Sequence, residues 1–196
     1  MTQDEILNEF KAADAILSGH FVLTSGLHSN TYLQCARVLM DAKRAERLCA
    51  VLGRLVRAQI SEQIDMVVSP AMGGVVVGYE MGRQLGVPAI FCERVDSMFS
   101  LRRGFTIEPG SNILIVEDVV TTGKSSMETV ECVKQYGAKA VGIASLIDRR
   151  GEADRALTLP LVALMKLTIP TYSGDSLPPE LANIPATKPG SRWLKG

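Results

Sequence analysis

Two adjacent acids and a run of hydroxyl groups stand together in the stretch VEDVVTTGKSS, residues 116–126. Glu117 and Asp118 end an apolar run that begins at Asn112, and residues 121–125 then read Thr-Thr-Gly-Lys-Ser. A turn into a helix offers backbone N–H groups, hydroxyls and a positive helix end, which suit a phosphate. The acids beside it can accept hydrogen bonds from vicinal hydroxyls. The pattern therefore predicts a site for a ribose 5-phosphate at the carboxyl end of a strand, where α/β sheets bind ligands.

Two other interpretations compete with this one. A P-loop for ATP or GTP needs a glycine five residues before the glycine of Gly-Lys-Ser, and that position is Asp118. In the other interpretation, Glu117 and Asp118 are a solvated strand end beside an ordinary helix cap. The combination of apolar strand, acidic pair, two apolar residues, hydroxyl-rich turn and helix favours the ribose phosphate.

Hydrophobic patterning predicts the elements that would hold this loop in place. Runs rich in Val, Ile and Leu are typical of strands buried on both faces, and they cover 64–69, 88–93, 112–118, 138–148 and 161–167. Helical patterns cover 73–86 and 124–137, and Asp41 is expected to cap a further helix that runs to about Ile60. This alternation predicts an α/β fold with a central, mostly parallel sheet flanked by helices.

The chain, residues 1–196, is predicted to be a single domain. The core sheet is expected within 62–168. Residues 1–40 are expected to form a small N-terminal hood. Within the hood we predict an amphipathic helix over 3–18 and short extended segments around a turn at Ser25–Gly26.

Composition narrows the functional classes. Hydrophobic residues make up 46% of the chain, enough for a core, and the formal net charge is zero, which gives no general affinity for nucleic acid. No apolar run reaches the roughly 20 residues that span a bilayer, and the acidic N-terminal stretch is not a signal peptide. Four cysteines without CxxC spacing indicate reduced thiols in a cytoplasmic protein, and with two histidines a zinc site is not expected. Five of the nine prolines lie in 170–196, which predicts an irregular tail.

The acidic pair followed by VVTTG and a serine resembles the phosphoribosyl diphosphate (PRPP) motif of the type I phosphoribosyltransferases. Within that family the chain is most similar to the orotate branch, over nearly its whole length. The segments that carry the resemblance are GHFVLTSG at 19–26, SPAMGG at 69–74, Glu93-Arg94, LRRGF at 101–105 and Ile147-Asp148-Arg149.

This resemblance implies a type I phosphoribosyltransferase fold and a reaction of orotate with PRPP. The products would be orotidine 5′-monophosphate and diphosphate, in pyrimidine (UMP) biosynthesis. It also implies Mg²⁺, bound mainly through substrate oxygens and water instead of a dedicated set of protein ligands. The partners implied are the two substrates and a second copy of the chain. In such a homodimer a flexible flap, residues 94–111, would reach the neighbouring active site.

By the same resemblance, Arg94, Glu117 and Asp118 are the catalytic residues, and Arg94 matches a basic position that binds PRPP. The full PRPP site would consist of Arg94, Glu117, Asp118, Val119, Val120, Thr121, Thr122, Gly123, Lys124 and Ser125. The acids would hold the ribose diol and residues 121–125 the 5′-phosphate. Lys124 could instead be a solvated lysine at a helix start.

The diphosphate loop implied by the family comprises Ala71, Met72 and Gly73, with Arg102 and Arg103 as further contacts. Glycine lets the backbone approach a diphosphate closely, although Gly73 and Gly74 could equally serve close packing of helix on sheet. Arg102 and Arg103 could be a solvated hairpin edge. The chain departs from the family at Met72, Gly73 and Thr24, where lysines are common, and the flap has no histidine.

The orotate site implied by the resemblance comprises Thr121, Arg149, Ser25 and Gly26. Arg149 could bind the orotate carboxylate with two hydrogen bonds, or could form a structural ion pair with Asp148, and Arg150 is expected to be solvated. Tyr32 and Leu33 lie where the family has aromatic residues against the pyrimidine ring, and core packing explains them as well.

Two other functions are compatible with a PRPP motif. A phosphoribosyltransferase for another nucleobase would share the PRPP loop without needing Arg149 or the N-terminal Ser-Gly. A non-catalytic regulator that senses PRPP would need an added DNA-binding domain or a strongly basic face, and the sequence indicates neither.

Overall fold

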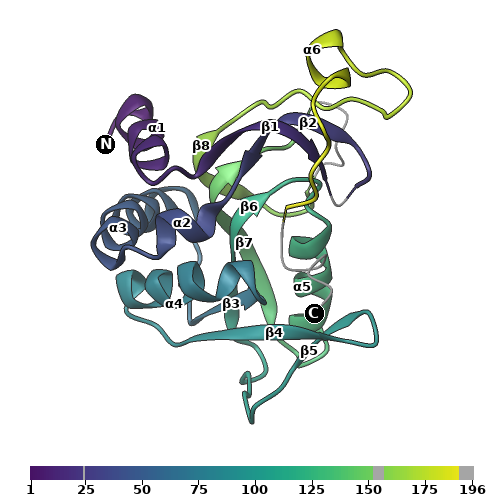
Figure 1. The fold of residues 1–196 in the computed structure, drawn as a ribbon. Helices are drawn as coiled ribbons and strands as arrows, with labels where there is room; N and C mark the ends of the chain where they lie inside the picture. Colours follow the sequence, from purple (N-terminus) through teal and green to yellow (C-terminus); the bar gives the residue numbers. More distant parts are fainter. Residues whose placement is uncertain (24, 152–156, 190–196) are drawn as a thin grey trace.

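The computed structural model describes residues 1–23, 25–151 and 157–189, and its centre is a six-stranded sheet (Figure 1). The strand order is β5-β4-β3-β6-β7-β8. Neighbouring strands are parallel except for the antiparallel pair β4–β5. The strands are β3 Met66–Pro70, β4 Ala89–Val95, β5 Met98–Leu101, β6 Asn112–Val120, β7 Lys139–Asp148 and β8 Leu161–Lys166. The predicted α/β class with a mostly parallel sheet is confirmed.

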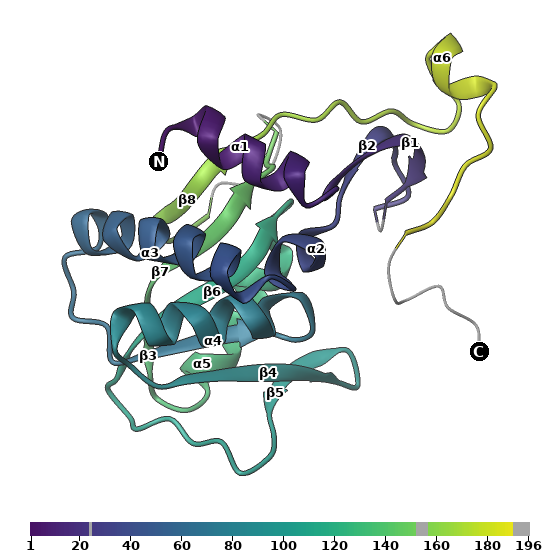
Figure 2. The ribbon, with the colours of Figure 1, turned by 60° about the vertical axis from the view of Figure 1, so that its left-hand side comes forward.

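Helices cover both faces of this sheet (Figure 2). The helices on one face are α1 Gln3–Ala12, α2 Cys35–Leu39, α3 Ala42–Gln59 and α4 Gly73–Leu85, and α5 Lys124–Lys134 lies on the other. Asp41 caps α3 by accepting from the N–H groups of Lys43 and Arg44, and Gly86, with φ of +77°, ends α4. Two hydrophobic clusters, one on each side of the sheet, form the core.

Strand β6 shows how the sheet separates its side chains. Leu114 and Val116 belong to the cluster under α3 and α4, whereas Ile113 and Ile115 belong to the cluster under α5. All four are fully buried. Because successive side chains of a strand point to opposite faces, the two residues that follow Val116 must also diverge.

The hood is a two-stranded antiparallel hairpin, β1 Ile16–Val22 and β2 His28–Leu33. The helix predicted over 3–18 is wrong in its second half. Helix α1 begins with a capping box at Thr2 and ends at Ala12, and Asp14 has φ of +48°. The apolar residues after Asp14 enter β1, where Ile16 pairs with Leu33. Strand pairing with β2 therefore overrides the helical periodicity of this stretch.

The C-terminal tail packs against the outside of the hood (Figures 1 and 2). Tyr172 forms a bridge with His28, and Thr187 forms one with Phe21. His20 bonds to the carbonyl of Ile184 through Nδ1 at 2.7 Å and to His28 Nδ1 through Nε2 at 2.6 Å. The tail contains the short helix α6 Pro179–Ala182. It contacts both strands of the hood through these bridges and hydrogen bonds.

Candidate active site

A cavity of about 400 Å³ opens at the carboxyl ends of β3 and β6. This is the edge at which parallel α/β sheets bind ligands. It brings together the two sequence segments that resemble a PRPP motif and a diphosphate loop. The residues that line it are Pro70, Ala71, Met72, Gly73, Gly74, Arg94, Phe99, Glu117, Asp118 and Ser125.

Glu117 points from β6 toward α5, as the strand alternation requires. It is only 8% exposed, and its carboxylate accepts a short hydrogen bond from the hydroxyl of Ser126, which is fully buried. Burial raises the pKa of Glu117 to about 7, the Ser126 hydrogen bond opposes that rise, and the negative charges of Asp118 and Glu128 add to it. Glu117 is therefore an acid that titrates close to neutral pH.

Asp118 points to the opposite face, toward the start of α4. A Cβ placed on Gly73 would lie 3.0 Å from both carboxylate oxygens of Asp118. The N–H of Val119 donates to Asp118 Oδ1 at 2.9 Å. Burial raises the pKa of Asp118, and that hydrogen bond partly offsets the effect. The two neighbouring acids thus enter one cavity from opposite sides of the sheet.

The loop at 121–125 turns tightly into α5. Gly123, with φ of +74°, occupies the position before the helix, and a Cβ there would lie 2.4 Å from Leu157 Cδ2. Glycine is required on both grounds. Thr121 and Thr122 are exposed beside the cavity, and the Thr122 hydroxyl accepts from the Lys124 N–H at 3.3 Å. Lys124 does not line the cavity, and its ammonium lies 3.8 Å from Glu128 on an exposed side chain, in agreement with a solvated lysine at a helix start.

The two glycines of the loop after β3 have different structural roles. Gly73 borders Asp118 and the cavity, whereas a Cβ on Gly74 would lie 3.0 Å from the Val116 carbonyl and 3.1 Å from Ser69 Cβ. Gly74 therefore serves the close packing of α4 on the sheet, and Gly73 shapes the site. The Met72 side chain is exposed, and the Ala71–Met72 peptide bond is cis.

Arg94 lines the cavity of its own chain. Its guanidinium forms a short ion pair with Glu128 of α5, donates to the Ser97 carbonyl at 2.8 Å, and lies 4.2 Å from the centre of the Phe99 ring. The expected flap at 94–111 begins inside β4 and continues as the β4–β5 hairpin, whose turn places Asp96 and Ser97 at positive φ.

Arg102 and Arg103 lie beyond this hairpin and do not line the cavity. Arg103 pairs with Glu93 through two hydrogen bonds of 2.9 Å, and its guanidinium lies 5.5 Å from the centre of the Phe91 ring. Arg102 is exposed. Their positions agree with the hairpin-edge interpretation.

Arg149 lies at the end of β7, beside the hood. Its N–H donates to the Val120 carbonyl at 2.8 Å. Burial raises the pKa of the Tyr32 hydroxyl; the charge of Asp118 adds to this and that of Arg149 opposes it. Tyr32 of β2 is therefore within electrostatic reach of both residues.

Arg150, not Arg149, pairs with Asp148, through two contacts of 3.0 Å. The expectation that Arg150 is solvated is wrong, because this bidentate pair holds it partly buried. Ser25 and Gly26 form the hood turn, where the Gly26 N–H donates to the Leu23 carbonyl at 2.9 Å. Neither lines the cavity. Thr24 lies outside the described residues.

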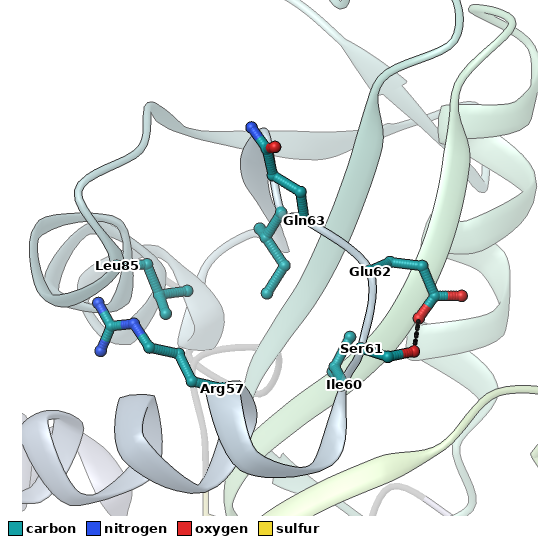
Figure 3. A pocket seen from close by; sticks show the side chains of 7 residues that line it. Arg57, Ile60, Ser61, Glu62, Gln63 and Leu85 are labelled. Atoms are coloured by element: carbon teal, nitrogen blue, oxygen red, sulfur yellow. Dashed lines mark hydrogen bonds between the residues drawn. The ribbon is translucent and has the colours of Figure 1, made fainter.

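A second cavity, of about 340 Å³, lies between the end of α3 and the loop that leads into β3 (Figure 3). Its Arg57 donates to the Gln84 carbonyl at 2.6 Å, and Ser61 donates to Glu62 at 3.0 Å. This is the amino end of the sheet, opposite the site above. None of the residues with a predicted role lines it.

Two features of the described residues bear on metal binding and on membranes. No group of three or more His, Cys, Asp or Glu side chains there is arranged to hold a metal ion. The helices of the described segments are all too short or too polar to cross a bilayer.

Comparison with known proteins decides the family. The pattern of the phosphoribosyl transferase domain matches residues 39–163, which is more than half of the chain. The chain belongs to the phosphoribosyltransferase family. The match includes both acids, the hydroxyl-rich loop and the loop at 71–74.

Relatives of this phosphoribosyltransferase carry a more specific enzyme name. The orotate phosphoribosyltransferase of Sphingopyxis alaskensis is 57% identical over 98% of each chain. That of Caulobacter vibrioides is 50% identical over the whole of both chains. Among solved structures, the orotate phosphoribosyltransferase of Aeropyrum pernix has a TM-score of 0.68 at 24% identity, covering 82% of this chain and 93% of that one. This structural likeness supports the fold.

Three residues around the cavity were not predicted. Ser126, Glu128 and Phe99 contact Glu117 or Arg94 directly. Ser126 and Glu128 sit on the inner side of the helix that follows the motif, and helical spacing from Lys124 could have placed them near the sheet. Nothing in the sequence indicated which strand residues they would meet.

Proposed function

We propose that the chain transfers the 5-phosphoribosyl group of PRPP to orotate, giving orotidine 5′-monophosphate and diphosphate. The observation that carries this proposal is the convergence of Glu117, Asp118 and Ser125 with the loop at 71–74 in one cavity. Full-length relatives at 50–57% identity are named for the same reaction. The product is the immediate precursor of UMP.

The chemistry asks for positioning and charge stabilisation more than for covalent catalysis. The bond from C1′ to the diphosphate oxygen breaks, and the diphosphate leaves with the bonding electron pair. The ring nitrogen of orotate, having given up its proton, bonds to C1′. The ribose carries oxocarbenium character in the transition state. The chain must hold the ring nitrogen against C1′ and stabilise the departing diphosphate. A closed, water-poor cavity strengthens both effects.

We assign the parts of PRPP to the parts of the cavity as follows. Residues 121–125 hold the 5′-phosphate through backbone N–H groups and the hydroxyls of Thr121, Thr122 and Ser125. Glu117 and Asp118 accept hydrogen bonds from the ribose hydroxyls. The backbone at 71–73 and the guanidinium of Arg94 face the diphosphate. Arg102 and Arg103 would reach it only if the loop that carries them moved.

Orotate differs from other nucleobases by its carboxylate. Arg149 is the residue we assign to that group, because a guanidinium can bind a carboxylate through two parallel hydrogen bonds. Thr121 is the second residue that we assign to orotate. Ser25 and Gly26 could approach the carboxylate from the hood turn, and Tyr32 could face the ring.

The donor set of the cavity fits Mg²⁺. The carboxylates of Glu117 and Asp118 are hard oxygen ligands, and Mg²⁺ commonly combines one or two carboxylates with substrate oxygens and water. Asp118 is the protein group closest to the diphosphate loop, so it is the residue we expect to touch the ion or its waters. Mg²⁺ would supply a Lewis acid that neutralises charge on the diphosphate.

We also propose that two copies of the chain form a homodimer. Val76 and Tyr79 lie on the exposed side of α4, and Met72 immediately precedes it; all three are more than half exposed. Met98 at the hairpin and Met40 at the end of α2 are also exposed. We call these five residues the α4 patch. Exposed apolar side chains that recur along one helix commonly mark an interface.

The β4–β5 hairpin would be the flap in such a dimer. Its exposed Met98 could reach the neighbouring cavity, while Arg94 at its base could serve either cavity. The four free, buried cysteines suit the reducing cytoplasm, where we place the reaction.

The test is a spectrophotometric assay of orotate. Purified protein should consume orotate only when both PRPP and Mg²⁺ are present, and chelation of Mg²⁺ should stop the reaction. Hypoxanthine and uracil are the control bases, and neither should be converted nor compete strongly. Conversion of a control base in preference to orotate would move the assignment to another member of the family.

A further inference from the structure

The two histidines of the chain form a hydrogen-bonded pair inside the hood, and neither lines the cavity. His20 of β1 and His28 of β2 join Nε2 to Nδ1 at 2.6 Å. The other ring nitrogen of His20, Nδ1, lies 2.7 Å from the carbonyl oxygen of Ile184 in the tail. His20 is buried, and neither ring takes part in the proposed transfer of the phosphoribosyl group. A buried polar group of this kind needs a reason of its own.

The Ile184 carbonyl sets the direction of the two hydrogen bonds. A carbonyl oxygen can only accept, so His20 Nδ1 carries the hydrogen, and Nε2 of the neutral ring is an acceptor. His28 Nδ1 is then the donor to His20 Nε2. The result is a chain of hydrogen bonds from His28 through His20 to Ile184, which we call the histidine clasp.

The histidine clasp joins two places at which the tail pairs with the backbone of the hood. On the β2 side, His28 and Tyr172 exchange both backbone hydrogen bonds, each of 2.8 Å. On the β1 side, the Thr187 N–H donates to the His20 carbonyl at 2.8 Å, and the Val22 N–H donates to the Thr187 carbonyl at the same distance. A two-stranded hairpin alone is marginally stable, so the hood depends on these two contacts with the tail.

A β-bulge lies at the position of His20. The register of β1 against β2 shifts by one residue between Ser18 and Phe21, so the extra residue falls at 19–20. Bulges of this kind redirect a side chain of the strand that carries them. The hairpin therefore departs from regular pairing at the point where the histidine clasp forms.

The histidine clasp closes the base of the hood turn. The two histidines stand on either side of the turn at 25–26, which we assign to orotate. Tyr32, which could face the orotate ring, packs on Phe21 with 5.7 Å between the ring centres, and Phe21 is bridged to Thr187 of the tail. The residues that we assign to PRPP come instead from β4, β6, α5 and the loop after β3. Loss of the clasp should therefore disturb the orotate half of the site and spare the PRPP half.

We propose that His20 and His28 are positioning residues for orotate: through the histidine clasp they hold the tail against the hood and thereby set the hood turn and Tyr32 over the site. This inference rests on the proposed function, because it takes orotate to be the substrate. It assigns no contact between either histidine and the substrate, so neither is a catalytic residue.

Two near-isosteric variants of His20 remove one hydrogen bond of the clasp at a time. An asparagine amide can occupy the place of Nδ1, so His20→Asn keeps the donor to Ile184 and loses the bond to His28. A glutamine amide can reach the place of Nε2, so His20→Gln keeps a partner for His28 and loses the bond to Ile184. Each variant should raise the KM for orotate by about fivefold, the scale of one hydrogen bond, and change the KM for PRPP by less than about twofold.

Gln3→Ala is the matched control for a purely structural role. The Gln3 amide also donates to a distant backbone carbonyl, that of Leu164 at 2.9 Å, but it does so outside the hood. This variant should lower thermal stability about as much as the His20 variants do and leave both KM values unchanged. Adding His28→Ala to His20→Asn should raise the orotate KM by less than about a further twofold, because the bond that the two residues share is already lost.

Hydrogen exchange in the substrate-free protein tests the clasp without an activity assay. His20→Gln should speed exchange of the Thr187 amide by about fivefold or more, whereas Gln3→Ala should leave it unchanged. The inference is overturned if both KM values rise equally in the His20 variants, if their orotate KM stays at the parent value, or if exchange at Thr187 is unchanged. A parent that consumes orotate normally separates these failures from that of the proposed function, and a parent that does not consume orotate overturns both.

Discussion

The carboxylate of Asp118 lies directly against Gly73, so close that a Cβ on Gly73 would stand 3.0 Å from both of its oxygens. The contact joins the strand that carries the acidic pair to the loop that we assign to the diphosphate. It also gives a reason for a glycine at position 73. A side chain at position 73 would displace the acid from the cavity.

Gly73→Ala should therefore damage PRPP binding without unfolding the chain. The new methyl group would force Asp118 to rotate, and we expect the KM for PRPP to rise by about tenfold or more, the scale of one lost charge-assisted hydrogen bond. The matched control is Gly53→Ala in α3, where a Cβ would meet its nearest neighbour at 3.5 Å, an ordinary contact. Steady-state kinetics that do not distinguish the two variants would count against the contact.

The buried Glu117 carboxylate should lower the free energy of unfolding above neutral pH. Its pKa is raised from 4.5 to about 7 in the folded protein, so the folded state holds the proton more tightly than the unfolded state. Raising the pH through this window therefore destabilises the fold, by on the order of 3 kcal/mol at most. Glu117→Gln, which stays neutral, should have a higher free energy of unfolding than the parent near pH 8.

The same comparison near pH 4.5 provides the control. There the parent Glu117 is largely protonated, and the two proteins should differ little in urea denaturation. A Gln variant that is less stable than the parent near pH 8 would show that burial does not penalise this carboxylate.

Glu128 holds Arg94 in the absence of substrate. Because a diphosphate would have to compete with this ion pair, Glu128→Gln should lower the KM for PRPP, by about two- to fivefold for a partly exposed pair. Glu131→Gln is the control, since Glu131 lies on the same helix and pairs with Lys134 at its exposed surface. A higher KM in the Glu128 variant would mean that the acid positions Arg94 for substrate.

Replacing Arg149 should affect the KM for orotate and not the KM for PRPP. Arg149→Ala should raise the KM for orotate by at least about 50-fold, because a bidentate pair with a carboxylate is lost, and leave the KM for PRPP nearly unchanged. Arg149→Lys should not restore it. Arg150→Ala is the neighbouring control: it removes the pair with Asp148 and should lower thermal stability more than orotate affinity. An effect of Arg149→Ala on PRPP alone would place this residue elsewhere in the site.

The α4 patch should be buried in a dimer interface in solution. Light scattering should give twice the mass of one chain for the parent, and Tyr79→Asp, which charges the middle of the patch, should shift the mass toward the monomer. Ile184→Asp introduces the same charge at an exposed apolar residue of the tail and should leave the mass unchanged. A parent that is monomeric at micromolar concentration would contradict the proposed dimer.

The sheet could be predicted from the sequence because its strands are buried on both faces. Apolar runs such as residues 112–116 have no other stable position in a chain of this size. The cap at Asp41 and the glycine after α4 marked helix ends for local reasons. The start of the first strand could not be predicted in the same way, since the residues after Asp14 continue a helical pattern, and only pairing with β2 selects a strand.

The same distinction applies to the candidate site, where some residues could be predicted from the sequence and others could not. Loop residues 117–125 were recognisable because the loop's chemistry depends on residues adjacent in sequence. The partners of Arg94, Arg103 and Arg150 could not be recognised. The sequence alone does not distinguish an arginine that pairs with an acid from one that binds a phosphate. Strand alternation fixes the directions of Glu117 and Asp118, yet the helices that receive them come from the tertiary fold.

The central claim is that the turn after β6 binds the sugar phosphate of PRPP. A crystal structure of the protein with PRPP and Mg²⁺ tests it most directly. We expect the 5′-phosphate on residues 121–125, the ribose hydroxyls against Glu117 and Asp118, and the diphosphate beside Gly73. Density for the ligand in another place, with this cavity holding only water, would contradict it.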